Sequence, residues 1–279
     1  MKHFFLVVLL FGAACTQQTQ KEQTTDKELV AEETPQEIVM KNFQLLVDSA
    51  NVDGSILILS KNTFYSNDFE WANERHIPAS TFKIPNSMIA LELGILESDS
   101  SMIYWDGKQR FMDRWEQDLS LRDAFHLSCV PCYQEIARKV GVDRMIEKTN
   151  ALNFGKLIID STNIDQFWLT DDAQISQFEE IDFLKRFHEK ELPISERTHE
   201  IMNRMMIIEQ DDRYVLRGKT GWSDSGEEHN CWFVGSVESD GVFHYFATNI
   251  TPAYDTDISE IVSIRKEISI KALKQLEIL

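Results

Sequence analysis

Apolar residues along the chain alternate between short continuous runs and helical periods. Residues 55–59 form an apolar run between Gly54 and Lys61, which predicts a buried strand, and residues 64–65 are its expected hairpin partner. Three later runs also predict strands, at residues 214–220, 232–237 and 242–250. Asp240-Gly241 separates the last two runs and favours a tight hairpin between them.

Helical periods fill most of the remaining chain. They predict helices over residues 38–50, 81–93, 121–140, 142–152, 175–190 and 258–279. The strands near the two chain ends can share one antiparallel sheet flanked by the terminal helices. Residues 95–205 then form a helical subdomain inserted into that sheet. The expected fold class is therefore mixed α/β (α+β).

The first 36 residues carry an export pattern instead of a fold pattern. A basic start and an apolar run over residues 4–11 precede Gly12-Ala13-Ala14, which predicts a signal peptide over residues 1–14. Cys15 follows the small residues directly, as in a bacterial lipobox, so we expect its lipidation; the alternative is an ordinary signal peptide with a chance Cys. Residues 15–36 are polar and predict a flexible tether. The folded domain should span residues 37–279 of an exported, periplasmic lipoprotein.

The charge balance excludes some partners. Lys and Arg total 28 against 46 Asp and Glu, a formal net charge of -18. Such a chain repels phosphate backbones, so we expect no nucleic-acid partner and no membrane contact besides the lipid at Cys15. The seven His are scattered without an H-E-x-x-H, and neither a P-loop nor a G-x-G-x-x-G occurs. The sequence therefore predicts no metal and no nucleotide cofactor.

Cys129 and Cys132 form a C-x-x-C pair, and Cys231 stands alone. In an exported protein the pair could be a local disulfide or a redox pair. A third interpretation, which we favour, is two small reduced side chains on a buried helix. No second pair is present to complete a zinc site.

A serine and a lysine at S-x-x-K spacing open one predicted helix. Ser80 and Lys83 fall on one helix face, where the amine can hydrogen-bond the hydroxyl and activate it as a nucleophile. Lys219-Thr220-Gly221 ends a predicted strand, where it can line a cleft, and Pro85 should loosen the helix that Ser80 opens. A second S-x-x-K, at residues 263–266, lies in the middle of a helix without free N–H groups for an oxyanion.

These motifs together carry a family resemblance. PASTFKIPNS at residues 78–87 resembles the active-site segment of the class D (oxacillinase-type) serine β-lactamases. Ser128-Cys129-Val130 is similar to the S-x-V motif of that family, IDQFWL at 164–169 to its Trp loop, and KTGWS at 219–223 to its K-T-G strand. SIRKEI resembles its C-terminal helix with a carboxylate-binding Arg, here Arg265. The resemblance runs from about residue 47 to 273.

The resemblance implies the serine β-lactamase and penicillin-binding transpeptidase fold, and hydrolysis of β-lactam antibiotics. Ser80 would form an acyl-enzyme, with Lys83 carboxylated by CO2 to N6-carboxylysine as general base. Trp168 and Val130 would stabilise that carbamate. Ser128 and Lys219 would protonate the leaving nitrogen. The substrate-binding set would be Thr220, Gly221, Trp222 and Arg265, and the backbone N–H groups of Ser80 and Trp222 would form the oxyanion hole.

Several points stay open at the level of the sequence. Lys156 replaces an Asn of the family motif and could face solvent, which we favour, or alter the loop near the carbamate. A non-hydrolysing β-lactam sensor and a peptidoglycan DD-transpeptidase or carboxypeptidase share the Ser-Lys pair and are the alternatives. The substrate range and the oligomeric state are not determined. Trp222, Tyr104, Trp105 and Phe111 could shape the substrate entrance.

Overall fold

The computed structural model describes residues 1–3, 34–224, 226 and 228–279. The expected lipidation site, Cys15, lies outside the described residues, as do most of the signal peptide and tether. The chain from Thr34 to Leu279 forms one compact unit. Its first strand begins at Gln36, whose N–H donates to the Asn62 carbonyl, so the folded part starts slightly before the predicted boundary at residue 37.

A seven-stranded sheet forms the centre of this unit, in the order β1-β3-β2-β11-β10-β9-β8. Its strands are β1 (Gln36–Val39), β2 (Val52–Ser60), β3 (Thr63–Ser66), β8 (Ile207–Gln210), β9 (Tyr214–Asp224), β10 (His229–Ser239) and β11 (Val242–Pro252). β1 runs parallel to β3, and the other pairs are antiparallel. β2 pairs with β11, which confirms that strands from the two chain ends share one antiparallel sheet.

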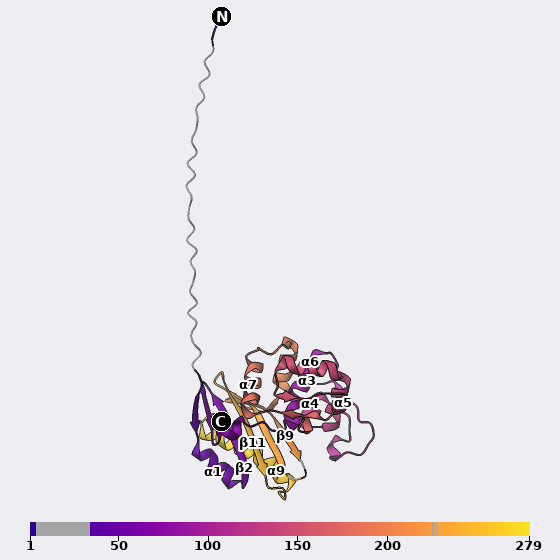
Figure 1. Cartoon of the computed structure of the whole chain (residues 1–279), viewed down its shortest axis with the longest axis vertical. Coiled ribbons are helices and arrows are strands. Elements are labelled where there is room, and N and C mark those ends of the chain that lie inside the picture. Colours follow the sequence, from indigo (N-terminus) through magenta and orange to yellow (C-terminus); the bar gives the residue numbers. More distant parts are fainter. Residues whose placement is uncertain (4–33, 225, 227) are drawn as a thin grey trace. The chain divides into compact units, whose positions relative to one another are not determined.

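Helices cover both faces of the sheet (Figure 1). The helices are α1 (Lys41–Ser49), α2 (Phe69–Asn73), α3 (Lys83–Glu92), α4 (Leu121–His126), α5 (Val130–Val140), α6 (Val142–Leu152), α7 (Gln177–His188), α8 (Glu196–Met205) and α9 (Ile258–Gln275). Alternate residues of β2 explain this layering, because successive strand side chains point to opposite faces. Ile56 and Ile58 pack in the core with α1 and α9, whereas Leu57 and Leu59 join the core that includes α3 and α7.

The inserted region is mainly helical, as predicted, and also contains two short ladders. β4 (Met102–Ile103) pairs with β5 (Leu119–Ser120), and β6 (Lys156–Leu157) pairs with β7 (Ala173–Gln174). Three 3-10 turns lie at η1 (Ala79–Phe82), η2 (Asp113–Trp115) and η3 (Phe167–Leu169). The sequence pattern missed α8, β1 and β8. The fold class is confirmed.

Two predicted helices were wrong in their extent. Residues 38–50 divide into the end of β1 and α1, because the edge strand β1 uses its backbone groups to pair with β3. Residues 121–140 divide into α4 and α5, because Ser128 adopts a left-handed φ of 53° between them. Left-handed backbone cannot continue a right-handed helix.

The loosening expected at Pro85 is also wrong. Pro85 lies in the first turn of α3, directly after the 3-10 turn η1. Proline is tolerated in the first helical turn, where N–H groups lack α-helical partners. The predicted hairpin is confirmed: Ser239 pairs with Val242, and Asp240 and Gly241 have φ angles of 51° and 74°.

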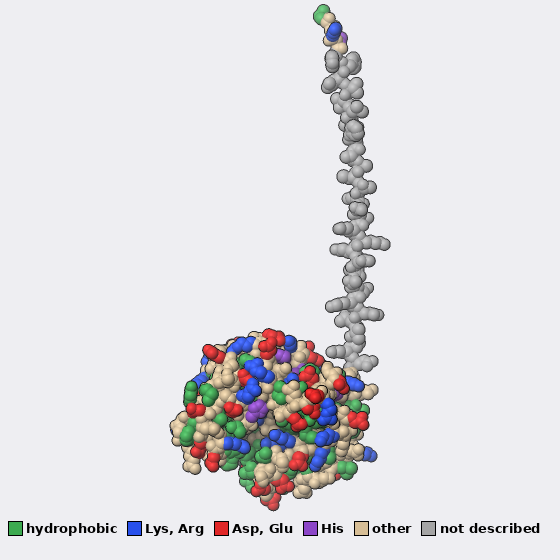
Figure 2. Space-filling view, turned by 180° about the vertical axis from the view of Figure 1, so that it is seen from behind, with side chains coloured by type: hydrophobic (Ala, Val, Ile, Leu, Met, Phe, Trp, Pro, Cys, Tyr) green, Lys and Arg blue, Asp and Glu red, His purple; other side chains and the backbone are tan. Residues whose placement is uncertain are grey.

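Figure 2 shows acidic and basic side chains interspersed over one face of the compact unit. This distribution agrees with charges that solvate the surface without forming a single-sign patch on that face. None of the helices in the described part of the chain has the length and apolarity that crossing a membrane requires.

Candidate active site

Ser80 and Lys83 lie where the 3-10 turn η1 passes into α3. Ala79 has a left-handed φ of 49°, an uncommon conformation for a residue with a Cβ, and it turns the chain sharply just before Ser80. Ser80 is 6% exposed and Lys83 is fully buried. The Lys83 Nζ donates to the Ser80 Oγ at 2.8 Å. The predicted Ser80–Lys83 pair is therefore formed, and the lysine is the more deeply buried of the two residues.

Lys83 is buried among apolar and aromatic side chains. Its Nζ lies 5.1 Å from the centroid of the Tyr133 ring, and no ion pair to a described acidic side chain balances its charge. Because burial penalises the ammonium form, it lowers the pKa of Lys83 to about 7. A large fraction of the Lys83 amine is thus neutral at physiological pH, and a neutral amine can act as a base or a nucleophile.

Ser128 and Lys219 meet on the opposite side of the site. The left-handed turn between α4 and α5 presents Ser128, and β9 supplies Lys219, whose Nζ donates to the Ser128 Oγ at 2.5 Å. Burial lowers the pKa of Lys219 well below its usual value, and the nearby charge of Lys83 acts in the same direction. The Phe125 ring lies 5.5 Å from this amine. The Ser128–Lys219 pair can therefore pass a proton within a dry environment.

Trp168 is fully buried in η3, and its ring stacks on Phe82 at 5.6 Å between centroids. Its Nε1 is buried and makes no hydrogen bond to any described residue. A buried N–H donor without an acceptor costs about 1 to 3 kcal/mol, which marks this position as a site for an acceptor group. Val130 is half-buried and lines the same cavity as Ser80.

The predicted substrate-binding residues line a cavity of about 480 Å³ together with Ser80 and Ser128. These residues are Thr220, Gly221, Trp222 and Arg265. The K-T-G segment lies within β9 and not at its end as predicted, because the pairing with β10 continues to Asp224. Arg265 of α9 is 6% exposed, and its Nη1 donates to the Gly221 carbonyl. The cavity therefore combines a nucleophile with a guanidinium that can bind an anion.

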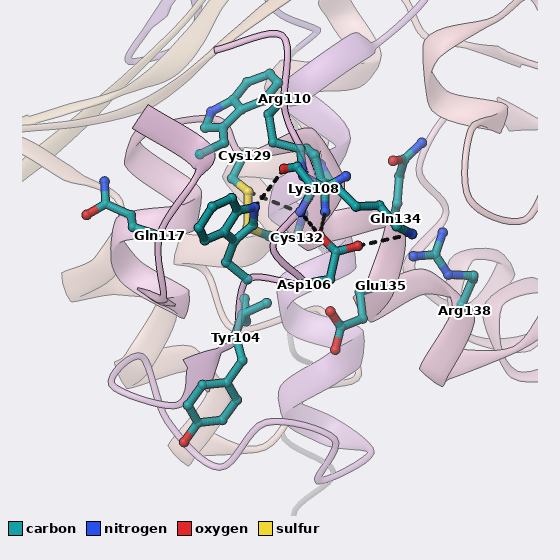
Figure 3. Close-up of a pocket in the computed structure, with 14 residues that line it drawn as sticks. Tyr104, Asp106, Lys108, Arg110, Gln117, Cys129, Cys132, Gln134, Glu135 and Arg138 are labelled. Atoms are coloured by element: carbon teal, nitrogen blue, oxygen red, sulfur yellow. Dashed lines mark hydrogen bonds and ion pairs between the residues drawn. A yellow bond between two sulfur atoms is a disulfide. The ribbon is translucent and has the colours of Figure 1, made fainter. Parts of the chain in front are cut away.

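The aromatic residues considered for the entrance divide between two cavities. Phe111 lines the Ser80 cavity, and its ring centroid lies 6.5 Å from that of Trp222. Tyr104 and Trp105 instead line a separate cavity of about 250 Å³ (Figure 3), so their expected role at the entrance is wrong. The loop between β4 and β5 carries all three residues, so its two parts line different cavities.

Cys129 and Cys132 form a disulfide at the N-terminus of α5, visible at the edge of the second cavity in Figure 3. The favoured interpretation, two reduced side chains, is therefore wrong. Cys129 is the N-cap residue and Cys132 lies in the first helical turn, which brings their Cα atoms to 5.4 Å, within the range that a disulfide spans. Cys231 is buried and is not part of this bond.

Lys156 and Ser263 do not line the Ser80 cavity, whereas Lys266 of the second S-x-x-K does. Lys156 is exposed on β6, in agreement with the solvent-facing interpretation. Ser263 is exposed within α9, and its hydroxyl donates to the Glu260 carbonyl of the same helix. The S-x-x-K at residues 263–266 therefore does not form a nucleophile site.

Sequence reasoning missed four side chains around the two lysines and the nucleophile turn. They are Thr81, Phe125, Tyr133 and Glu180. Phe125 and Tyr133 have the helical spacing of ordinary core residues, so their pattern carries no functional signal. Glu180 could have been noticed only as an acidic residue that falls on the apolar face of its helix.

Comparison with known proteins agrees with this geometry. The penicillin-binding protein transpeptidase domain matches residues 45–269. The chain is 38% identical to β-lactamase OXA-48 of Klebsiella pneumoniae, over 79% of this chain and 81% of that protein. The chain belongs to the class D serine β-lactamases. A crystal structure of the class D β-lactamase YbXI from Nostoc matches with a TM-score of 0.81 and 39% identity, over 85% of this chain and 99% of that one.

A second class D β-lactamase, from Sebaldella termitidis, matches with a TM-score of 0.83 and 32% identity, over 88% of this chain and 99% of that one. Both structures therefore share the arrangement of sheet and helices described above. In this class D β-lactamase the two Ser-Lys pairs lie at the junction of η1, the α4–α5 turn and β9.

Proposed function

We propose that the protein hydrolyses the β-lactam ring of penicillin-type antibiotics through a Ser80 acyl-enzyme and thereby confers resistance. One observation carries this proposal. Ser80 and Ser128 line one cavity together with the buried Arg265, and each serine is hydrogen-bonded to a buried lysine, Lys83 or Lys219. A nucleophile, a base, a proton donor and an anion-binding group are thus present within one site.

Acylation begins with attack of the Ser80 Oγ on the lactam carbonyl carbon. The base at Lys83 takes the hydroxyl proton, and the proposed oxyanion hole consists of the backbone N–H groups of Ser80 and Trp222. The bond between the carbonyl carbon and the ring nitrogen then breaks. Ser128 gives that nitrogen a proton and regains one from Lys219, which donates to its hydroxyl. Water later hydrolyses the ester and releases the product.

Carboxylation of Lys83 by CO2 fits its surroundings. The lowered pKa leaves a neutral amine that can react with CO2, and the Trp168 Nε1 is a buried donor that no described residue satisfies. We propose that Trp168 holds the carbamate, and that Phe82 and Val130 exclude water from it. When present, the carbamate supplies a general base for both acylation and deacylation. CO2 or bicarbonate is then the required small molecule.

Arg265 and Thr220 are proposed to bind the carboxylate that β-lactam antibiotics carry. A planar guanidinium binds a carboxylate in a bidentate manner, and the low exposure of Arg265 strengthens that attraction. Gly221 allows β9 to approach the turn that carries Ser80. A Cβ at this position would lie 2.9 Å from the Pro78 carbonyl oxygen, which is too close for a side chain.

Hydrolysis of a chromogenic cephalosporin tests the proposal. Ser80→Ala should lower kcat/KM by at least about 1,000-fold, because it removes the nucleophile. Ser263→Ala is the matched control, since it removes the serine of the other S-x-x-K and should leave turnover unchanged. Normal turnover in Ser80→Ala would refute the mechanism. Failure of bicarbonate to restore activity in CO2-depleted buffer would refute the carboxylation of Lys83 but not the Ser80 acyl-enzyme.

Two alternatives of the same fold differ in the fate of the acyl-enzyme. A sensor domain or a DD-transpeptidase would react once with penicillin and retain it, whereas a β-lactamase releases it by water attack. Mass spectrometry of the protein after mixing with a penicillin separates these cases. Rapid return to the unmodified mass is expected, and an acyl adduct that persists for hours contradicts the proposal.

We also propose that the enzyme is exported to the periplasm as a lipoprotein anchored at Cys15. The support is the export pattern of residues 1–14 and the polar segment that follows Cys15. Labelling of cells with a radioactive fatty acid should mark the wild-type protein and not Cys15→Ala, which should also leave the membrane fraction. Equal labelling of both proteins would exclude this anchor.

A further inference from the structure

A buried carboxyl group lies directly behind the nucleophile turn. Glu180, in the first turn of α7, is fully buried, and its Oε1 is 2.6 Å from the Oγ1 of Thr81, the residue that follows Ser80. Its Oε2 makes no hydrogen bond to any described residue. An ionised carboxylate with one free oxygen and no cation is among the most costly groups to bury.

The single hydroxyl hydrogen of Thr81 indicates the protonation state of Glu180. The Thr81 Oγ1 also lies 2.9 Å from the Pro78 carbonyl oxygen, which can only accept. A hydroxyl carries one hydrogen, so Thr81 cannot donate to both the Pro78 carbonyl and Glu180. Both contacts are satisfied at once if Glu180 is a neutral acid that donates its hydrogen to Thr81, and Thr81 donates to Pro78.

The electrostatic surroundings favour the same state. Burial raises the pKa of Glu180 to about 8, and the negative charge of Glu179 adds to this effect, while the contact with Thr81 opposes it. Glu179 itself is paired with Arg75. The elements packed on α7 include α2, β2, β10 and β11. Their ionisable side chains are Glu70, Asp53, His229, Cys231, Glu238, His244 and Tyr245, and Lys83 follows η1. None of these groups contributes to the shift at Glu180.

The Pro78 carbonyl connects this acid to the site. It lies so close to β9 that a Cβ on Gly221 would be 2.9 Å from it. The preceding carbonyl, of Ile77, accepts from the side chains of Trp232 and Asn230 on β10. The Ile77 carbonyl therefore holds the chain before Ser80 against β10, and the next carbonyl, of Pro78, is bonded to Thr81 beside β9.

We propose that Glu180 is a positioning residue for Ser80: as a neutral acid it donates to Thr81, which leaves the Thr81 hydroxyl free to donate to the Pro78 carbonyl and so fix the turn that carries Ser80. The inference rests on the proposed role of Ser80 as nucleophile. Ionisation of Glu180 changes this hydrogen bonding, because the carboxylate can only accept and the Thr81 hydroxyl then donates to it. The Pro78 carbonyl then loses that bond and keeps the one from the Thr81 backbone N–H, at 3.1 Å, so the turn that carries Ser80 is held less firmly.

Glu180→Gln provides a direct test, because its amide N–H can donate to Thr81 at every pH. We expect kcat of this variant near the wild-type value at pH 7. Between pH 7 and 9 the ratio of variant kcat to wild-type kcat should rise about tenfold, since only wild type loses the neutral acid. The ratio cancels the titrations of Lys83 and Lys219, which both proteins share. A ratio that stays constant with pH would overturn the proposal.

Two matched controls separate positioning from general stability. Glu189→Gln makes the same substitution at an exposed residue just after α7, and its kcat ratio to wild type should not change with pH. Thr81→Ser keeps the hydroxyl, so its kcat should depend on pH as in wild type. For Thr81→Val we expect a lower kcat at pH 7 and no decrease of kcat with a midpoint near pH 8. A decrease of kcat near pH 8 that persists in Thr81→Val would contradict the proposed action of Glu180 through the Thr81 hydroxyl.

Infrared spectroscopy tests the protonation state without reference to activity. Difference spectra of wild-type protein between pH 7 and 9 should show the loss of one protonated carboxylic acid, because exposed carboxyl groups are already ionised at pH 7. Absence of that signal overturns the assignment even where Glu180→Gln does not fold. If the signal is present and Ser80→Ala still hydrolyses substrate, the role of Ser80 has failed while the protonation of Glu180 stands.

Discussion

Lys83 and Trp168 show how burial changes the chemistry of single side chains. Each is fully buried, and each keeps a polar atom inside the core. For Lys83 the cost of burying a charge is reduced by loss of a proton, and for Trp168 the cost of an unpaired N–H persists until an acceptor arrives. A carbamate on Lys83 would resolve both costs, which is why these two residues are best understood together.

Trp168→Phe isolates the hydrogen bond, because it keeps an aromatic ring against Phe82 and removes the N–H. The concentration of bicarbonate for half-maximal activity should rise about tenfold, since a hydrogen bond to a charged group contributes about 1.5 kcal/mol or more. Nitrocefin hydrolysis across a bicarbonate series measures this. Phe167→Leu, in the same turn, is the control. An unchanged bicarbonate requirement in Trp168→Phe would remove Trp168 from the proposed carbamate site.

The pH dependence of carboxylation follows from the lowered pKa of Lys83. CO2 reacts with the neutral amine, so acidification below about pH 7 protonates Lys83 and reduces the reactive fraction. At limiting and fixed dissolved CO2, activity should therefore fall about tenfold for each pH unit below that value. Stopped assays after equilibration at each pH test this. Activity that is independent of pH between 5 and 7 at limiting CO2 would contradict it.

At the scale of elements, the junction of α4 and α5 joins stability to the site. Ser128 in the left-handed turn contacts Lys219, and the next residue, Cys129, is both the N-cap of α5 and one partner of the disulfide to Cys132. Cys129 also accepts a hydrogen bond from the Cys132 backbone N–H. The start of α5 is thus held by a covalent link directly beside the proposed proton donor.

Loss of this disulfide should destabilise the protein by about 2 kcal/mol, the loop-closure entropy of a very short loop. Cys132→Ala should lower Tm by several degrees in calorimetry, since 1 kcal/mol corresponds to about 2 to 4 °C for a domain of this size. Treatment of wild type with a dithiol reductant should reproduce the shift. The same reductant should leave the Tm of the double variant Cys129→Ala, Cys132→Ala unchanged, and a further shift there would assign the effect to another group.

At the scale of the whole molecule, a buried carboxylate joins separate segments of the chain. Asp99 follows α3 and accepts hydrogen bonds from Arg122 of α4 and Arg204 of α8. Burial alone would raise the pKa of Asp99, but the hydrogen bonds and charges of the two arginines outweigh burial and hold that pKa below its usual value. Asp99 therefore stabilises the inserted region as long as it is ionised.

Asp99→Asn should lower the free energy of unfolding by about 2 kcal/mol at pH 7, since it removes a charge that two arginines share. Because the folded-state pKa is depressed, this contribution is present above the unfolded pKa near 3.9 and disappears as the pH falls through the folded value. Urea unfolding of both proteins over a series of pH values from 7 downward tests both statements. Asp106→Asn, at an exposed ion pair, is the control and should change stability much less than Asp99→Asn does. A difference for Asp99→Asn that does not shrink as the pH falls would argue against the ionic contribution.

The sequence by itself determined the class of fold and the main motifs, because strand and helix periods and the S-x-x-K and K-T-G spacings are local. Residues 55–59 and 242–250 were recognised as strands from their apolar runs, and Ser80, Lys83, Ser128 and Lys219 from their motifs. Only the tertiary structure decided what depends on contacts between distant segments. These include the Cys129–Cys132 bond, the left-handed break at Ser128 and the contact of the buried Glu180 with Thr81. Burial and hydrogen-bond pairing set these properties, and neither can be read from the spacing of residues along the chain.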